Sequence, residues 1–200
     1  MRIQSLPIVV IMILAFWTSV TRPAPAEVVL VEDGKATSVL VLPEQPAEDE
    51  QLAATELQTH IEKISGAQLE IVRGETPEGL TSVSIGLSLA PAARKEIRNE
   101  SEEPASFRIS CSPNGVSLAG LSPEGTLFAA YDLLERLGVR WYMPGNLGTV
   151  IPDQETIAIP AGTRIEAPSF PARHLQSVHR SMPWYRRQRL GGAYFPSAHG

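Results

Sequence analysis

The chain has 200 residues, of which 43% are hydrophobic, 20% charged and 6% aromatic, a balance typical of globular proteins. Its 17 basic and 22 acidic side chains leave a net charge of -5, which argues against a general nucleic-acid binder, because such proteins carry a basic excess. The single cysteine, Cys111, excludes an internal disulfide and a zinc site built from several thiolates.

The first 26 residues have the pattern of a secretory signal peptide. Arg2 precedes the apolar run 6–17, and residues 24–26 form an A-x-A cleavage site. The apolar run is shorter than the roughly 18–20 residues that span a bilayer, which favours a cleaved signal over an uncleaved anchor. We therefore expect a secreted or periplasmic protein that begins at Glu27 and has no transmembrane segment after cleavage.

Short apolar runs in the region 27–163 predict a sheet. Six of them are rich in β-branched residues or alternate with polar residues, and they lie at 28–31, 39–42, 69–72, 83–86, 107–111 and 116–119. The last two runs flank Asn114-Gly115, a strong signal for a tight antiparallel hairpin.

A first helix is predicted over 48–65. Ala53, Leu57 and Ile61 recur every four residues and therefore share one helical face. Three acidic residues in the first turn complement the helix dipole, and Gly66 suits a left-handed C-terminal cap.

A second helix is predicted to begin after Ser122, whose hydroxyl can cap free amides, with Pro123 at the first helical position. Its apolar stripe consists of Leu127, Ala130, Tyr131, Leu134 and Leu137. Because each helix has one apolar face, both are expected to pack on one side of the sheet. The predicted fold class is α+β, a two-layer sandwich of a mixed sheet with two helices on one face.

The composition changes after residue 163. Residues 27–163 hold 21 acidic and 9 basic side chains, whereas residues 164–200 hold six arginines and one acidic residue, Glu166. A basic segment of this kind can bind phosphate or acidic polymers. Its aromatic residues favour the start of a second domain instead; they are Phe170, Trp184, Tyr185, Tyr194 and Phe195.

Residues 53–67 and 120–145 carry a family resemblance. The second segment, which contains Gly-Thr-Leu-Phe and Arg-Trp-Tyr-Met-Pro-Gly, resembles a "GTLYGVYDFLE…LGCRWYAPG" stretch of secreted bacterial proteins, with Val139 where that pattern often has cysteine. The first segment resembles the first helix of the N-terminal accessory domain of α-glucuronidases and β-hexosaminidases, and the bacterial proteins that the second segment resembles are a related group with an uncharacterised barrel domain. The resemblance covers residues 27 to about 190, and it implies a sheet with two helices on one face, without catalytic residues, ahead of a (β/α)8 barrel that performs the glycoside chemistry.

The resemblance extends into the last part of the chain. Residues 168–173 resemble the Pro-x-Phe-x-x-Arg segment that leads into the first barrel strand, and residues 184–192 resemble the first barrel helix. The implied organisation is a signal peptide at 1–26, an accessory domain at 27–163 and the beginning of an incomplete barrel at 164–200. The resemblance also implies that Arg173 binds substrate, because a guanidinium suits a vicinal diol or a uronate carboxylate. An equally good alternative is a salt bridge of Arg173 at the domain junction.

The sequence predicts no catalytic residue, metal site or cofactor in this chain. A barrel needs roughly 200–250 residues, and 37 follow the first domain. Glycoside hydrolysis needs two carboxyl groups about 5–10 Å apart, and the last segment offers only Glu166. The acidic residues 48–50 are better explained by the helix dipole, and Glu100, Glu102 and Glu103 by a loop. His174 and His179, five residues apart, do not share a helical face as zinc ligands would.

These observations predict the non-catalytic N-terminal domain of a secreted carbohydrate-active protein, a glycoside hydrolase resembling α-glucuronidases. Its expected partners are its own downstream barrel and, through the parent protein, a polysaccharide or oligosaccharide. One alternative is a non-enzymatic carbohydrate-binding or adhesion module, which would expose Trp141 and Tyr142 in an aromatic strip on the helix-free sheet face. Burial of both at the domain junction would favour the accessory domain. A third alternative is a remnant without function.

Overall fold

The computed structural model describes residues 26–175 and 182–192. The expected signal peptide at 1–26 therefore lies almost entirely outside the described residues, as do His179 and residues 193–200. Among the described residues, no helix is long and apolar enough to cross a bilayer.

Six strands form the central mixed sheet, in the order β11 (Gly162–Glu166), β6 (Phe107–Ser112), β7 (Gly115–Gly120), β5 (Thr81–Ile85), β3 (Ser38–Leu42) and β4 (Ile71–Arg73). Strand β3 runs parallel to β4 and β5, and β5 runs parallel to β7. Strand β6 is antiparallel to both β7 and β11. The predicted hairpin around Asn114-Gly115 is the β6–β7 pair, and all six predicted strands of the region are present.

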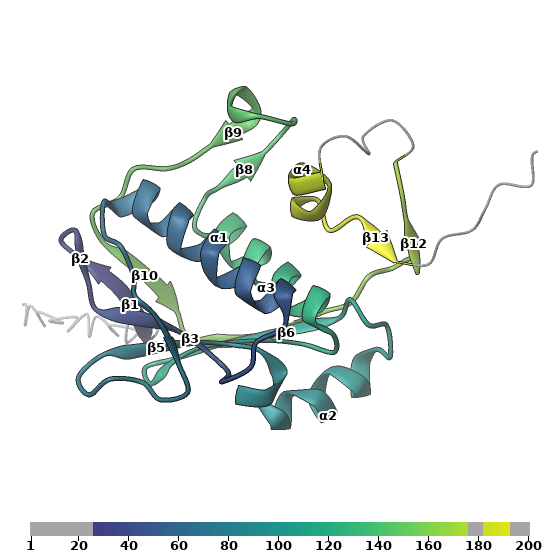
Figure 1. Cartoon of the computed structure of the whole chain (residues 1–200), viewed down its shortest axis with the longest axis horizontal. Coiled ribbons are helices and arrows are strands. Elements are labelled where there is room, and N and C mark those ends of the chain that lie inside the picture. Colours follow the sequence, from purple (N-terminus) through teal and green to yellow (C-terminus); the bar gives the residue numbers. More distant parts are fainter. Residues whose placement is uncertain (1–25, 176–181, 193–200) are drawn as a thin grey trace, which may run out of the picture.

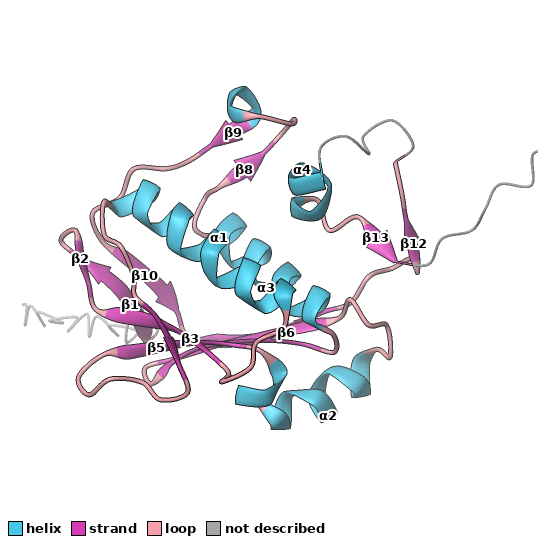
Figure 2. Cartoon of the chain, in the orientation of Figure 1, coloured by secondary structure: helices cyan, strands magenta, loops and turns pink. Residues whose placement is uncertain are grey.

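Helices α1 (Glu48–Ser65) and α3 (Pro123–Arg136) lie side by side on one face of this sheet (Figures 1 and 2). Their apolar faces bury large side chains against the strands, including Leu57, Phe128 and Tyr131. The Ser122 hydroxyl accepts a hydrogen bond from the Gly125 amide at 3.1 Å, as the capping pattern predicts. The α+β sandwich with two helices on one face is thus confirmed.

A third helix, α2 (Pro91–Glu100), covers part of the opposite face (Figure 1). It packs Ala93 and Ile97 against Ala119 of β7. The prediction of a loop over 100–103 was wrong for Glu100, which is the last residue of this helix. The sequence analysis missed the helix because only two of its residues are buried and most of the others are charged, which leaves a weak hydrophobic stripe.

A smaller sheet and a projecting hairpin complete the sandwich. The smaller sheet has the order β10 (Ile157–Pro160), β1 (Glu27–Glu32) and β2 (Lys35–Ala36). Strands β8 (Arg140–Trp141) and β9 (Thr149–Val150) flank a short 3-10 turn and rise above the helix layer (Figure 1).

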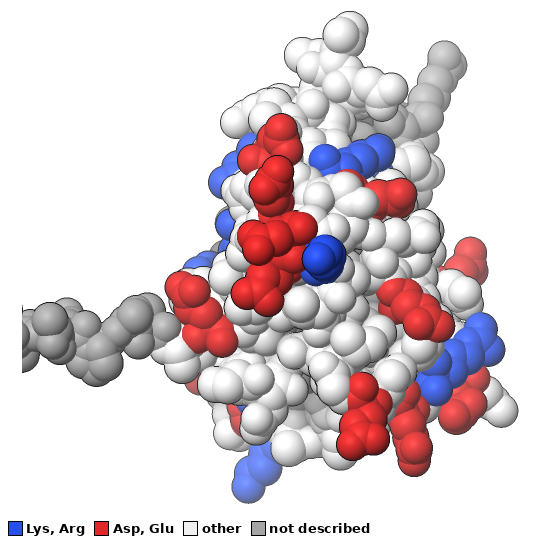
Figure 3. Space-filling model, turned by 90° about the vertical axis from the view of Figure 1, so that its left-hand side faces the viewer, with Lys and Arg blue, Asp and Glu red and all other residues white. Residues whose placement is uncertain are grey.

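Acidic side chains predominate on the side of the molecule that Figure 3 shows.

Strand β11 bears on the expected domain organisation. The expected boundary between residues 163 and 164 falls inside it, and it pairs with β6 over its whole length. Glu166 therefore ends a strand of the sandwich. Only residues 167–171 connect β11 to β12 (Ala172–Arg173), the next strand of the chain.

Candidate functional site

The candidate site is the junction between the helix layer of the sandwich and the C-terminal segment. That segment contributes β12, helix α4 (Met182–Arg187) and β13 (Gly191–Gly192), which pairs with β12. Figure 1 places α4 beside the β8–β9 hairpin, on the same side of the sheet as α1 and α3.

Three arginines of the C-terminal segment bind acidic residues of the helix layer. Arg187 donates hydrogen bonds from Nη2 to both carboxylate oxygens of Glu56 on α1, at 2.9 and 3.0 Å. Arg186 forms an ion pair with Asp49 at the start of α1. Arg189 donates from Nη2 to Glu135 of α3 at 2.7 Å. The acidic sandwich and the basic segment that composition distinguished are therefore complementary surfaces of one junction.

Trp141 lies at the centre of this junction and is only 4% exposed. Its ring makes edge contacts with His60 of α1 and Tyr131 of α3, with ring centres 5.4 and 5.7 Å apart. The Arg187 guanidinium lies 5.4 Å from the ring centre. The Trp141 carbonyl accepts hydrogen bonds from Trp184 Nε1 at 3.0 Å and from the side-chain amide of Gln188 at 2.7 Å.

The exposed aromatic strip of the binding-module alternative does not form from these residues. Trp141 is buried on the helix side of the sheet, whereas its neighbour Tyr142 is 71% exposed on the projecting hairpin. The surface hollow on the opposite sheet face is lined mostly by small polar side chains: Ser82, Ser84, Ser110, Ser112 and Ser117. The condition set for the accessory domain, burial of both residues at the junction, is met by Trp141 and not by Tyr142.

His60 is buried beneath Trp141 and 3% exposed. Its Nδ1 lies 2.8 Å from the carbonyl oxygen of Glu56, one turn earlier in α1. Burial lowers the pKa of the His60 imidazole, although the carbonyl and the carboxylate of Glu56 oppose this effect. Sequence analysis gave His60 no role, because a single histidine on an apolar helix face has no distinguishing pattern.

Arg173, the expected substrate-binding residue, lies on β12 at the edge of the junction. Its Nε donates to the carbonyl of Arg189 at 3.0 Å, and its Nη1 donates to the carbonyl of Phe170 at 2.8 Å. Its Nη2 is buried without an acceptor among the described residues. In the described part of the chain, ion pairs at the junction come from Arg186, Arg187 and Arg189 rather than from Arg173.

Glu124, in the first turn of α3, lies near Arg173. Burial raises the pKa of its carboxyl group, and the positive charge of Arg173 partly offsets this effect. The carboxylate also approaches β13, since a Cβ added at Gly191 would lie 3.1 Å from its Oε1. Glycine at that position therefore lets the segment approach α3 closely.

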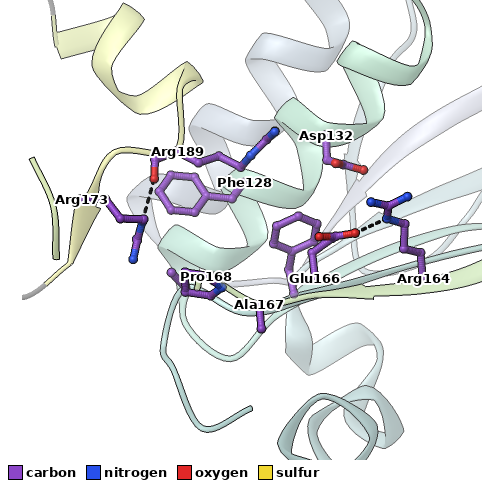
Figure 4. Close-up of a pocket in the computed structure, with 10 residues that line it drawn as sticks. Phe128, Asp132, Arg164, Glu166, Ala167, Pro168, Arg173 and Arg189 are labelled. Carbon is purple, nitrogen blue, oxygen red and sulfur yellow. Dashed lines mark hydrogen bonds and ion pairs between the residues drawn. The ribbon is translucent and has the colours of Figure 1, made fainter. Parts of the chain in front are cut away.

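A partly open cavity of about 230 Å³ lies between α3, β6, β11 and the C-terminal segment (Figure 4). Its polar side chains are Asp132, Arg164, Glu166, Arg173 and Arg189, and Phe107 and Phe128 contribute apolar surface. In Figure 4 the side chains of Asp132, Glu166 and Arg164 face one another, while Arg173 turns its guanidinium towards Pro168.

The cavity brings together two acidic residues that the sequence analysis did not associate. Glu166 was expected as the only carboxyl group of the last segment, and Asp132 comes from the middle of α3. Both carboxylates already have arginine partners: Arg136 Nε donates to Asp132 Oδ2 at 2.7 Å, and Arg164 pairs with Glu166. The Asp132–Arg136 pair could have been found from its four-residue spacing on the polar face of the helix.

Arg189 has an unusual backbone conformation in this cavity. Its φ is 54°, in the left-handed region, where a residue with a side chain stores about 1–3 kcal/mol of strain. Its Nη1 is buried without an acceptor among the described residues, although Nη2 pairs with Glu135. A buried donor without a partner costs about 1–3 kcal/mol.

The described residues contain no group of three or more histidine, cysteine or acidic side chains arranged to hold a metal ion. His174 Nδ1 lies 2.7 Å from the Tyr185 hydroxyl. Cys111 is buried on β6, where burial raises the pKa of its thiol and so disfavours the reactive thiolate.

Comparison with known proteins finds similarity in solved structures but not in sequence families. No protein-family model and no curated protein sequence matches the chain. A solved GH115 4-O-methyl-α-glucuronidase with specificity for decorated arabinogalactans matches with a TM-score of 0.56 and 16% identity, over 73% of this chain and 19% of that enzyme. The matched part of the chain therefore shares its fold with a part of that enzyme. It spans about a fifth of the length of the enzyme it resembles.

Proposed function

We propose that the chain is the non-catalytic N-terminal domain of a secreted carbohydrate-active protein, a glycoside hydrolase resembling α-glucuronidases. The observation that carries this proposal is the structural similarity to a GH115 glucuronidase, of which the chain matches 19%. In this proposal the reaction centre lies in the remaining part of the enzyme, which this chain does not match.

In this proposal the sandwich positions the first elements of the following domain. Helix α4 is held against the helix layer by three kinds of contact. Trp141 is buried at the junction, its carbonyl accepts hydrogen bonds from Trp184 and Gln188, and three arginines form ion pairs with the helix layer. The two carbonyl bonds of Arg173 fix its guanidinium beside β12. Arg173 is then a substrate-binding residue whose sugar is bound jointly with the downstream domain.

The deciding experiment compares the 200-residue chain with a product extended through the reading frame downstream of the Gly200 codon. Both are purified and assayed on aryl glucuronides and on aryl N-acetylhexosaminides. We expect turnover by the extended protein and none by the chain. Activity of the chain that persists through purification would overturn the non-catalytic assignment, and a stop codon directly after Gly200 would leave the remnant alternative.

The role of Arg173 is tested by Arg173→Ala in the extended protein. We expect weaker sugar binding with an unchanged melting temperature. Arg98→Ala is a suitable control, because Arg98 is half exposed and its ion pair with Glu102 lies away from Arg173. A lower melting temperature with unchanged sugar affinity would make Arg173 a structural residue instead.

A further inference from the structure

His60 lies buried where the sandwich meets the C-terminal segment. Its Nδ1 is 2.8 Å from the carbonyl oxygen of Glu56. A carbonyl oxygen only accepts hydrogen bonds, so Nδ1 carries the proton of the neutral ring, and a second proton would occupy Nε2. Protonation would therefore place a positive charge inside the junction.

One carboxylate oxygen of Glu56 contacts both the C-terminal segment and His60. Glu56 Oε2 accepts hydrogen bonds from Arg187 Nε at 3.2 Å and from Arg187 Nη2 at 3.0 Å. The same oxygen lies 3.5 Å from His60 Nδ1. The side chain of Glu56 is 13% exposed and that of Arg187 is 22% exposed, so water and salt screen these charges little. A charged imidazole would therefore compete with Arg187 for the Glu56 carboxylate.

The charged groups that face His60 come from α1 and α4. On α1, Glu56 favours the imidazolium form and Lys63 disfavours it, and both stay in place if the segment leaves. On α4, Arg187 disfavours the imidazolium form through its own positive charge, and it also neutralises Glu56. Docking of α4 therefore makes protonation of His60 less favourable in two ways.

The aromatic neighbours of His60 carry no charge. Trp141 of β8 packs its ring against the imidazole, and Tyr131 of α3 contacts the same indole ring. Tyr131 stays neutral, because burial raises the pKa of its hydroxyl group. Burial is also the main reason why the pKa of His60 is lowered. The proton of His60 is thus coupled to α4 through Glu56 and Arg187 rather than through the aromatic rings.

We infer that acid releases residues 182–192 of the C-terminal segment from the sandwich, because protonated His60 competes with Arg187 for the Glu56 carboxylate. Release removes the positive charge of Arg187 and frees Glu56, so the released form binds a proton more readily than the docked form. Docking is then complete above the pKa of His60 in the released form. It weakens as the pH falls through the pKa in the docked form, by up to about tenfold per pH unit. The inference goes beyond the proposed function and does not depend on it, since every group in it belongs to the described residues.

The test is hydrogen exchange of the 200-residue chain and of His60→Gln between about pH 5.5 and 8, where ordinary carboxyl groups stay ionised. Mass spectrometry follows peptides from residues 184–190. The intrinsic exchange rate changes with pH, so the two proteins are compared with each other at each pH. We expect the ratio of wild-type to variant protection to fall about tenfold from the upper to the lower end of this range. A constant ratio would overturn the inference.

Two controls separate this effect from others. His174→Gln removes the second histidine of the described residues, whose Nδ1 lies 2.7 Å from the Tyr185 hydroxyl of α4. This variant should keep the pH dependence of the wild type, and its loss there would assign the effect to His174 instead. Residues 107–120 report opening of the sandwich, so equal protection there and at 184–190 would show global unfolding and overturn local release.

Glu124 lies at the same junction but titrates in the opposite sense. Burial raises the pKa of its carboxyl group in the docked form, so protonation of Glu124 strengthens docking as the pH falls. This residue cannot produce the expected loss of protection in acid.

A second measurement does not require His60→Gln to fold. NMR titration of the His60 imidazole signals in the wild type and in Arg187→Gln measures the same coupling from the other side, because linkage is reciprocal. The pKa of His60 should be about one pH unit higher in Arg187→Gln, the equivalent of a tenfold change in docking. Arg98→Gln, at an exposed ion pair, should leave that pKa unchanged. An equal pKa in the wild type and Arg187→Gln would overturn the inference, whereas the scaffold proposal is judged separately by turnover of the extended protein.

Discussion

Trp141 contacts all three helices that meet at the junction. It touches α1 through His60, α3 through Tyr131 and α4 through Arg187, while its carbonyl anchors two further side chains of the C-terminal segment. Removing its ring would leave a void lined by all three helices.

Trp141→Ala is therefore expected to lower the free energy of unfolding by about 3–5 kcal/mol, the usual cost of truncating a buried large aromatic residue. Chemical denaturation followed by far-UV circular dichroism measures this change. Tyr142→Ala provides a control one residue away, where 71% exposure predicts a change within about 0.5 kcal/mol. Similar effects of the two substitutions would contradict the burial of Trp141.

His60 is expected to make stability depend on pH. Burial lowers its folded-state pKa below the ordinary value of 6.5, so the unfolded chain binds a proton more readily. The contribution of neutral His60 to the free energy of unfolding is complete above about pH 6.5. It is lost as the pH falls through the folded-state pKa, by up to about 1.4 kcal/mol per pH unit. Urea denaturation between pH 5 and 8 should show this slope in the wild type and a shallower one in His60→Gln. An unchanged slope would assign the pH dependence to other groups.

At the scale of residues, the sequence predicted which side chains are buried, but it did not predict which side chains contact one another across the fold. The helical spacing placed Leu57 and Tyr131 in the core, and the Ser122 cap was predicted from residue type alone. The pairing of Arg187 with Glu56 joins residues 131 positions apart, and no local pattern encodes such a contact.

At the scale of elements, the start of α3 depends on close contact with β7. A Cβ added at Gly120 would lie 2.2 Å from the Thr126 nitrogen and 2.3 Å from the Gly125 carbonyl carbon. These are backbone atoms that cannot move without shifting the helix. Glycine at position 120 therefore sets the distance between the helix and the sheet.

Gly120→Ala is expected to destabilise the fold by at least about 1–3 kcal/mol, the range for overpacking a close-packed interior. Thermal unfolding by calorimetry measures the loss. Gly162→Ala is the matched control, since a Cβ there meets no atom within 4 Å and the backbone does not need glycine. A neutral Gly120→Ala would show that the helix can move away from the strand at little cost.

Elements with a strong hydrophobic periodicity were predictable from the sequence. Helix α1 has the predicted bounds, 48–65, because the apolar spacing, the acidic first turn and the glycine cap all indicate the same helix. Helix α2 was missed, and so were β10 and β11, where exposed and buried residues alternate only briefly or not at all. The cavity was not predictable either, because it forms where β11 and the segment after it meet α3.

At the scale of the whole molecule, charge complementarity holds the C-terminal segment on the sandwich. Arg187→Gln should weaken this docking and raise hydrogen exchange at residues 184–190 by about tenfold, since the Arg187–Glu56 pair is mostly shielded from water. Mass spectrometry of the exchanged peptides measures the effect. Arg98→Gln, which breaks an exposed pair between α2 and the residues that follow it, should leave that exchange unchanged. Protection that survives Arg187→Gln would assign the docking to apolar contacts alone.

The signal-peptide pattern of the first 26 residues predicts a shortened chain. Expression of the full coding sequence in a secreting bacterial host should give a mature protein that begins at Glu27, because the A-x-A site ends at Ala26. Intact mass measurement and N-terminal sequencing check the cleavage point. Recovery of the uncleaved chain in the membrane fraction would support the anchor alternative.

The short connection from β11 to β12 limits how the protein can be rearranged. Its five residues include Pro168 and Pro171, whose rings restrict backbone rotation, and both of its ends are strands already paired with neighbours. The connection therefore restricts how β12 can be oriented relative to the sandwich. A chimera that grafts a foreign sandwich at this point would have to reproduce that orientation within a few residues.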